Sequence, residues 1–349
     1  MSSTDRTALA GTSSRAGLDD TELQAFLQKT SRTFALTIPM LPEALRREVG
    51  VAYLLFRILD TFEDATHWPP ARRNDALLEL VALLAEGDGE RRSAEDAARD
   101  WVREPPVEHP GYVELLGAAP RVIAWHRALP APSRRALHRH LDESARGMCR
   151  FVERTDAQGT LRLQTMDDLH DYCFVVAGLV GQMLTELFVL GDSRLAGQAT
   201  ELGARAVRFG EALQLVNILK DAGQDALEGR VYLPTGVPLA EVFQLARGDL
   251  RAAAEYCEIL REAGADRGLV AFNAVNASLA MATLRLLRDR GHGTKLTRPQ
   301  VLSIVAGVMH ALEHRAPLFE PAWYGPARAS ADAAPPAPPA SAAWDHSSQ

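Results

Sequence analysis

Two apolar helical segments of this chain each lead into a pair of acidic residues one helical turn apart. The pair Asp60 and Asp64 follows the apolar run 51–59, and the pair Asp221 and Asp225 follows a similar run. Residues four apart share a helix face, so each pair directs its carboxylates the same way. Carboxylates are normally avoided beside buried apolar surface. The fold must therefore supply both pairs with partners of opposite charge.

Two such acidic clusters, facing each other, would form an oxygen-rich site for several divalent cations. Mg²⁺ prefers oxygen ligands and is usually held by a few carboxylates together with the phosphates of a substrate. The pattern therefore favours chemistry on a diphosphate.

The residues that precede the first acidic pair continue its helix face. Tyr53, Arg57, Asp60 and Asp64 follow a 4-3-4 spacing, with Glu63 beside them. An arginine one turn before the carboxylates could orient them or bind an anionic leaving group. The alternative is an exposed helix end with ordinary ion pairs between neighbouring turns.

The second acidic pair extends a polar line along an otherwise apolar helix. Gln214 and Asn217 precede Asp221 at helical spacing, and a buried polar line needs partners such as metal ions or phosphates. Lys220 and Arg230 are close in sequence and could contact diphosphate oxygens. Alone, this segment could be a solvated helix end, but the presence of two such segments favours a site.

Composition indicates a globular protein without a general nucleic-acid-binding surface. The 349 residues are 47% hydrophobic, which allows a large core, and the net charge is −7. Cys149, Cys173 and Cys257 are widely spaced in apolar contexts, as reduced cysteines of intracellular proteins are. The N-terminus lacks the apolar core of a signal peptide. The most apolar stretch, 175–190, is interrupted by polar residues and is short for a membrane span. We expect a cytoplasmic protein, at most peripheral to a membrane.

Helical spacing of apolar residues prevails over most of the chain and predicts an all-α fold in a single domain over 19–325. The Ser/Thr-rich segment 1–18 and the Ala/Pro-rich segment 326–349 are predicted to be disordered tails. Capping boxes at Thr165 and Thr297 predict helix starts, the first helix running to about residue 190. The sequence does not alternate between strand and helix patterns, so a Rossmann sheet is not expected.

Five separated motifs, in family order between residues 20 and 310, resemble the squalene/phytoene synthase family. They are Ser31-Arg32-Thr33-Phe34; Tyr53, Arg57, Asp60-Thr61 and Glu63-Asp64; Tyr172-Cys173 with Val176-Ala177-Gly178-Leu179-Val180-Gly181; Gln214, Asn217-Ile218, Asp221 and Asp225; and Gly229-Arg230 with Tyr232-Leu233-Pro234. The Asp-Thr-x-Glu-Asp form of the first acidic motif is more similar to the squalene synthase branch than to phytoene synthases.

The resemblance implies an isoprenoid synthase fold with a central cavity between two aspartate-rich helices. It also implies Mg²⁺-dependent, head-to-head condensation of two farnesyl diphosphates to presqualene diphosphate and squalene. One alternative is a phytoene synthase that joins two geranylgeranyl diphosphates without NADPH. A second is a non-catalytic family member that acts as a binding or assembly protein. Oligomeric state is left open.

The resemblance also implies roles for individual residues. The metal ligands would be Asp60, Glu63, Asp64, Asp221 and Asp225. Contacts to diphosphate oxygens or their metals would come from Ser31, Arg32, Gln214, Asn217, Lys220 and Arg230. The catalytic residues would be Tyr53, Arg57, Tyr172, Phe34 and Phe272, with Tyr172 a candidate for proton transfer. An aromatic face attracts a cation, which suits the two phenylalanines to a cavity that holds carbocations.

Some positions depart from the family pattern. Phe174 and Val175 stand where the family has His and Tyr, and Gln224 stands where the second acidic motif has Glu. With these changes we still expect diphosphate ionisation, and whether the NADPH-dependent second step occurs is left open. Two further expectations concern packing. Gly178 and Gly181 predict a close approach to a neighbouring helix or a ligand, and the pair Arg72-Arg73 is expected to be exposed.

Overall fold

The computed structural model describes residues 20–85 and 92–323. The two tails predicted from the sequence lie outside these residues, so the domain limits at 19 and 325 stay predictions. Fourteen α-helices are present in the described part of the chain. They are α1 Asp20–Thr30, α2 Phe34–Thr37, α3 Glu43–Glu63, α4 Pro70–Leu84, α5 Ala94–Arg103, α6 Pro110–Gly117, α7 Ala119–Ala128, α8 Ala131–Glu153, α9 Met166–Cys173, α10 Leu179–Gly191, α11 Ala199–Leu227, α12 Leu239–Glu262, α13 Arg267–Arg290 and α14 Arg298–His314.

Short elements complete the described fold. The helical turns are η1 Ile38–Met40, η2 Phe174–Gly178, η3 Ser193–Gln198 and η4 Pro321–Trp323, and the strands are β1 Leu161–Arg162 and β2 Arg230–Val231. The strands are parallel, with Leu161 opposite Arg230. The prediction of an all-α fold is confirmed, since the sheet consists of these two short strands.

The helix starts predicted from the sequence are present. Thr165 and Thr297 both accept a hydrogen bond from the backbone three residues later, and Asp168 and Gln300 close their capping boxes. The helix that begins at Met166 continues through the π-helical turn η2 and ends at Gly191, next to its predicted end. A π-helical turn adds one residue to a helical turn and often occurs at functional sites.

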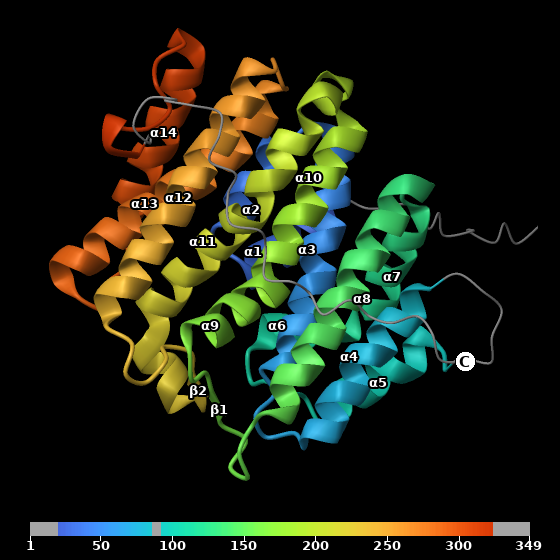
Figure 1. The fold of residues 1–349 in the computed structure, drawn as a ribbon. Coiled ribbons are helices and arrows are strands. Elements are labelled where there is room, and N and C mark those ends of the chain that lie inside the picture. Colours follow the sequence, from blue (N-terminus) through green and yellow to red (C-terminus); the bar gives the residue numbers. More distant parts are fainter. Residues whose placement is uncertain (1–19, 86–91, 324–349) are drawn as a thin grey trace, which may run out of the picture.

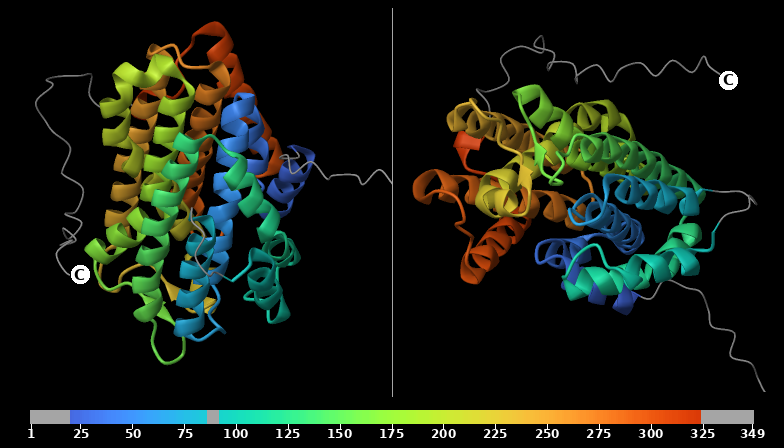
Figure 2. Two further views of the ribbon diagram at one scale, coloured as in Figure 1. Left: turned by 90° about the vertical axis from the view of Figure 1, so that its right-hand side faces the viewer. Right: turned by 90° about the horizontal axis from the view of Figure 1, so that it is seen from below.

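In Figure 1, α12, α13 and α14 lie on one side of the bundle and α4, α5, α7 and α8 on the other, with α3, α10 and α11 between them. Helix α11 packs against α10, η2, α12 and α13, while α3 packs against α4, α7, α8 and α10. Strands β1 and β2 lie at one end of the bundle, beside the C-terminal ends of α3 and α11 (Figure 1). The view along the bundle in Figure 2 shows the helices surrounding this central group.

Two of the central helices approach each other through glycine. A Cβ atom on Gly181 would lie 2.1 Å from the carbonyl oxygen of Ala206, and one on Gly210 would lie 2.0 Å from that of Ala177. A Cβ on Gly178 would lie 3.1 Å from a side-chain carbon of Val207 on α11. The predicted close approach at Gly178 and Gly181 is therefore confirmed, and it brings the backbones of α10 and α11 together.

Two stretches in the described part of the chain are long and apolar enough to cross a membrane by length and composition, Met166–Gly191 and Arg267–Arg290. The first contains the run that the sequence analysis judged too short and too polar, and joining it to α9 supplies the missing length. Core helices of soluble proteins pass the same test. In the apolar 18-residue window of each stretch, half of the first and 78% of the second are buried inside the bundle.

Candidate active site

The acidic ends of α3 and α11 face each other at the strand-bearing end of the bundle. Arg230, at the start of β2, lies between them. Its Nε atom is 3.4 Å from a carboxylate oxygen of Asp64, and its Nη2 atom is 3.4 Å from one of Asp225. One guanidinium therefore connects the two acidic helices, and the arrangement predicted from the sequence is confirmed.

Aromatic contacts hold the polar face of α3 in place. The hydroxyl of Tyr53 donates to the carbonyl of Thr30 over 2.9 Å, and its ring centroid lies 5.3 Å from that of Phe34. Arg57 donates from Nε to the Tyr53 hydroxyl over 3.4 Å and lies over the ring of Tyr112. These contacts fix the guanidinium one turn before the carboxylates.

The same arginine reaches the first acidic residue. Its Nη1 atom lies 3.5 Å from a carboxylate oxygen of Asp60. On α11, Lys220 donates to the side-chain oxygen of Asn217 over 2.9 Å and lies 3.2 Å from a carboxylate oxygen of Asp221. Each acidic helix thus carries its own cation, and Arg230 connects the two.

The carboxylates at this end hold more negative charge than their surroundings compensate. Burial raises the pKa of Asp60 and of Asp225 to about 6. Burial and the neighbouring Asp64 raise the pKa of Glu63, and burial raises that of Asp64 although Arg230 opposes the change. Such shifts show that ionising every carboxylate is unfavourable without further positive charge.

These donors fit hard divalent cations. The ligand atoms are carboxylate oxygens, the type that Mg²⁺ prefers. Within 20–85 and 92–323, no three His, Cys, Asp or Glu side chains converge closely enough to hold a metal ion by themselves. Mg²⁺ keeps several waters and commonly completes its coordination with substrate phosphates. Scattered carboxylates with unmatched charge suit that mode of binding.

Asp60, at the acidic end, lines a mainly apolar cavity of about 210 Å³. Its walls come from α3, α10, α11 and α13, with Tyr256 contributed by α12. Seven of the sequence-predicted site residues line it. They are Phe34, Tyr53, Arg57, Asp60, Gln214, Asn217 and Phe272. The structure thus places one predicted metal ligand, Asp60, and the two phenylalanines on one continuous space.

The other predicted residues do not line the cavity. Glu63, Asp64, Asp221, Asp225, Lys220 and Arg230 belong to the acidic end described above. Ser31 accepts a hydrogen bond from the backbone N–H of Phe34 over 3.0 Å at the start of α2, and Arg32 is exposed.

Tyr172 does not line the cavity. Its ring stacks on that of Tyr232, with centroids 4.6 Å apart, and its hydroxyl donates to the Tyr232 hydroxyl over 2.9 Å. Burial and the nearby Glu63 raise its pKa well above the ordinary value. Its predicted role in proton transfer stays a prediction.

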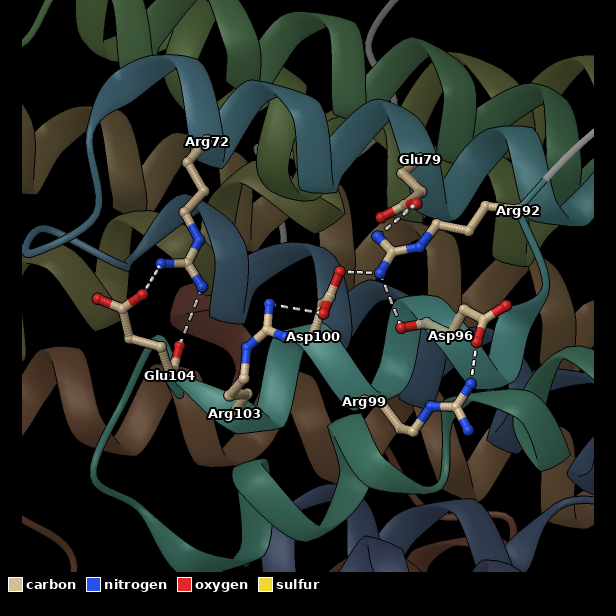
Figure 3. Close-up of polar contacts among 8 residues, drawn as sticks. All are labelled: Arg72, Glu79, Arg92, Asp96, Arg99, Asp100, Arg103 and Glu104. Carbon is tan, nitrogen blue, oxygen red and sulfur yellow. Dashed lines mark hydrogen bonds and ion pairs between the residues drawn. The ribbon is translucent and has the colours of Figure 1, made fainter.

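A buried arginine beside the first acidic motif was not predicted from the sequence. Arg73 on α4 is only 4% exposed and donates to the backbone carbonyl of Glu63. The expectation that Arg72-Arg73 is exposed is therefore wrong for Arg73, although Arg72 pairs with Glu104 at the surface (Figure 3). Arg73 has the spacing of the buried α4 positions Ala76 and Leu77, a signal that marked it as a core residue.

Comparison with known proteins gives the same assignment over most of the chain. The sequence model of the family described as squalene/phytoene synthase matches residues 27–304. A squalene synthase of Mycosarcoma maydis is 30% identical over 213 residues, 60% of this chain and 34% of that protein. A phytoene synthase of Thermus thermophilus is 37% identical over 145 residues, 40% of this chain and 47% of that protein. The chain thus spans about a third to a half of the length of these relatives.

Solved structures show the same fold. The complex of TcSQS with the ligand BPH1237 is 26% identical, with a TM-score of 0.62, and the match covers 84% of this chain and 85% of that one. A dehydrosqualene synthase in complex with a ligand shares the fold at 19% identity and a TM-score of 0.54, over 84% of this chain and 96% of that one. With its paired acidic helices on a shared cavity, the chain belongs to the squalene/phytoene synthase family.

Proposed function

We propose that this chain joins two farnesyl diphosphates head to head in a Mg²⁺-dependent reaction that gives presqualene diphosphate and then squalene. One observation carries the proposal: Arg230 connects Asp64 of α3 and Asp225 of α11, one helical turn beyond Asp60, which lines an apolar cavity. This geometry suits a substrate with a doubly charged head and a long hydrocarbon tail.

The residues at the mouth would bind and ionise the diphosphate. Asp60, Asp64 and Asp225 would hold Mg²⁺, which supplies Lewis-acid stabilisation of the departing diphosphate. Arg57 and Arg230 already lie among these carboxylates, so their charge is in place when negative charge develops on the leaving group. The allylic C–O bond breaks, and its electron pair leaves with the diphosphate.

The cavity would protect the carbocation that remains. Phe34 and Phe272 line it with aromatic faces, which attract a cation without reacting with it. The apolar walls exclude water that would otherwise quench the cation. The double bond of the second prenyl chain then attacks C1 of the first, and loss of a proton closes the cyclopropane of presqualene diphosphate. A second ionisation, rearrangement and hydride transfer from NADPH would give squalene.

Synthesis of phytoene from two geranylgeranyl diphosphates, without NADPH, is the second candidate. The 37% identity to the phytoene synthase of Thermus thermophilus favours it, and the acidic end suits either diphosphate. A purely binding role is the weakest candidate, because every predicted acidic ligand is present.

We also propose a cytoplasmic enzyme in at most peripheral contact with a membrane, since its substrates are lipids. Cell fractionation tests this. Recovery of the protein only in the membrane fraction, from which only detergent releases it, would contradict the proposal.

Product analysis tests the proposal. The purified chain is incubated with Mg²⁺ and either farnesyl or geranylgeranyl diphosphate, with and without NADPH. We expect pyrophosphate release from farnesyl diphosphate and an extractable thirty-carbon product whose identity depends on NADPH. Phytoene from geranylgeranyl diphosphate as the main product would select the second candidate. Absence of pyrophosphate release from both substrates would contradict the enzymatic proposal.

A further inference from the structure

At the end away from the carboxylates, the cavity is lined by one side chain from α12, a helix that otherwise lies outside its wall. Among the described residues, Tyr256 is the one α12 side chain that lines the cavity. It is 2% exposed and meets Thr185 of α10 and Phe209 of α11, which line the same end. Three helices therefore supply this floor.

Hydrogen bonds fix the floor. The hydroxyl of Thr185 donates to the carbonyl oxygen of Gly181 over 2.9 Å. The single proton of that hydroxyl is thereby used, so the Tyr256 hydroxyl is the donor in the 2.9 Å contact with Thr185. Both hydroxyls are satisfied within a buried, mainly apolar environment. Displacing Tyr256 would break a buried hydrogen bond, which is unfavourable.

Aromatic packing supports the same floor. The rings of Phe209 and Tyr256 meet edge to face, with centroids 5.4 Å apart. Beside them, the rings of Phe188 and Phe272 also meet edge to face, at 6.1 Å. Edge-to-face pairs of this kind are favourable beyond the area they bury. Four aromatic rings in two edge-to-face pairs therefore contribute to the lining of the cavity.

The depth of the cavity can be compared with prenyl chains. Phe209 and Asp221 lie twelve residues apart on α11, a separation of about 18 Å along the helix axis. With carbon–carbon bonds of about 1.5 Å, an extended farnesyl chain is about 14 Å long and a geranylgeranyl chain about 19 Å. With the diphosphate and its metal ions placed beyond Asp221, toward Asp225, the roughly 18 Å between Asp221 and Phe209 is available to the hydrocarbon. An extended farnesyl chain is shorter than this span, and a geranylgeranyl chain meets the floor.

We propose that Tyr256, held by Thr185 and packed against Phe209, sets the upper limit of prenyl length and makes this chain select farnesyl over geranylgeranyl diphosphate. This inference rests on the proposed function, because it concerns the substrate of the same site. The tyrosine acts as a specificity-determining residue through its bulk, and its hydroxyl holds that bulk in position.

Substitutions of Tyr256 test the inference. The readouts are kcat/KM for pyrophosphate release with Mg²⁺ and each of the two prenyl diphosphates, and Kd for the matching thiolodiphosphates, which do not ionise readily. For Tyr256→Ala we expect the geranylgeranyl-to-farnesyl ratio of kcat/KM to rise roughly tenfold or more, the range of a pocket that gains several carbon positions. Tyr256→Phe keeps the ring and should keep the preference for farnesyl.

A matched variant controls for the loss of packing on α12. Leu260 is one turn away, fully buried and absent from the cavity lining, so Leu260→Ala should lower stability without changing the ratio. An unchanged ratio in folded Tyr256→Ala overturns the inference, as does a parent chain that prefers geranylgeranyl diphosphate. If Tyr256→Ala does not fold, Phe209→Leu opens the same end of the cavity. Its geranylgeranyl-to-farnesyl ratio of kcat/KM then tests the inference.

Failure of the proposed function would look different. A chain that releases no pyrophosphate from either substrate contradicts the enzymatic proposal. In that case, the affinities for the two thiolodiphosphates still test whether Tyr256 limits the length of the prenyl chain. A farnesyl preference that is lost in Tyr256→Ala supports the floor, and equal affinities of the parent chain for both lengths contradict it.

Discussion

Arginine and acidic side chains cluster in two regions of this molecule, with different consequences. On α4, α5 and the segments beside them, four arginines and four acidic residues pair with one another (Figure 3). At the cavity mouth, five predicted acidic ligands share Arg57, Arg230 and Lys220. The first group is balanced in charge, and the second has an excess of carboxylates.

The two clusters also differ in the solvent exposure of their side chains. The side chains of Arg99 and Arg103 in the surface cluster are 73% and 77% exposed, whereas that of Arg230 at the mouth is 14% exposed. Water screens the surface pairs, so each contributes little. At the mouth, desolvation raises the pKa of the carboxylates and leaves charge that a cation must neutralise. The same residue types therefore give a solvated surface in one place and a cation-dependent site in the other.

Removal of one carboxylate at the mouth should have the largest effect. We expect Asp64→Asn to lower pyrophosphate release from farnesyl diphosphate by roughly a hundredfold or more, because it removes a proposed ligand and an electrostatic contribution to leaving-group departure. Steady-state assays at saturating Mg²⁺ measure this loss. Asp100→Asn in the surface cluster is the matched control and should keep the parent rate. Equal rates for both variants would remove the distinction between the two clusters.

Removal of Arg230, which connects the two acidic helices, should have the second-largest effect. In the presence of a chelator, Arg230→Gln leaves Asp64 and Asp225 without their common partner, and we expect the free energy of unfolding to fall by about 2–3 kcal/mol. Denaturant unfolding with an unchanged m-value measures the loss. The control is Arg99→Gln, whose ion pair is exposed. A stability equal to that of the parent chain would show that Arg230 does not compensate the acidic helices.

The raised pKa values of Asp60 and Asp225 predict a pH dependence of stability in the metal-free chain. Their folded-state pKa of about 6 lies above the ordinary 3.8. The stabilisation is therefore complete below pH 3.8 and is lost as pH rises through 6, by roughly 2 kcal/mol after allowance for solvent screening. Unfolding titrations between pH 4 and 7 measure it.

A double variant separates the pH dependence due to Asp60 and Asp225 from an opposing pH dependence due to His126. Burial lowers the pKa of His126 to about 4, from 6.5, so its contribution to stability grows as pH rises through the same window. The variant that carries both Asp60→Asn and Asp225→Asn retains His126, and its stability should gain relative to the parent chain as pH rises. Parallel pH profiles for the two proteins would contradict the assigned shifts.

The smallest effect is expected in the surface cluster. Arg99→Gln or Arg103→Gln should change the free energy of unfolding by less than about 0.5 kcal/mol, because exposed ion pairs gain little over their hydration. Added salt should reduce even that difference. A loss comparable to that in Arg230→Gln would show that the eight residues in Figure 3 act as a cooperative network.

Much of the site could be predicted from local spacing. Asp60 and Asp64 share a face with Tyr53 and Arg57 because a helix repeats every 3.6 residues, and the folded chain keeps that face. The capping boxes at Thr165 and Thr297 are equally local and are present. The close approach at Gly181 could be anticipated because glycine is unfavourable in a helix without a packing reason.

Other features depended on neighbours that no local pattern names. Arg73 follows a surface residue in sequence, yet it lies buried behind the first acidic motif. Tyr172 turns toward Tyr232, away from the cavity wall, because the parallel strand pair brings β2 to the end of α9. Tyr256 reaches the cavity from α12 through contacts with α10 and α11.

The amino-acid sequence by itself determined the helices, their polar faces and the presence of two acidic motifs, since these follow from the periodicity of a single helix. Only the tertiary structure decided that Arg230 lies between Asp64 and Asp225 and that Tyr256 closes the cavity. The reason is physical: which residues of distant segments meet is set by the joint packing of all the helices and not by spacing within any one of them.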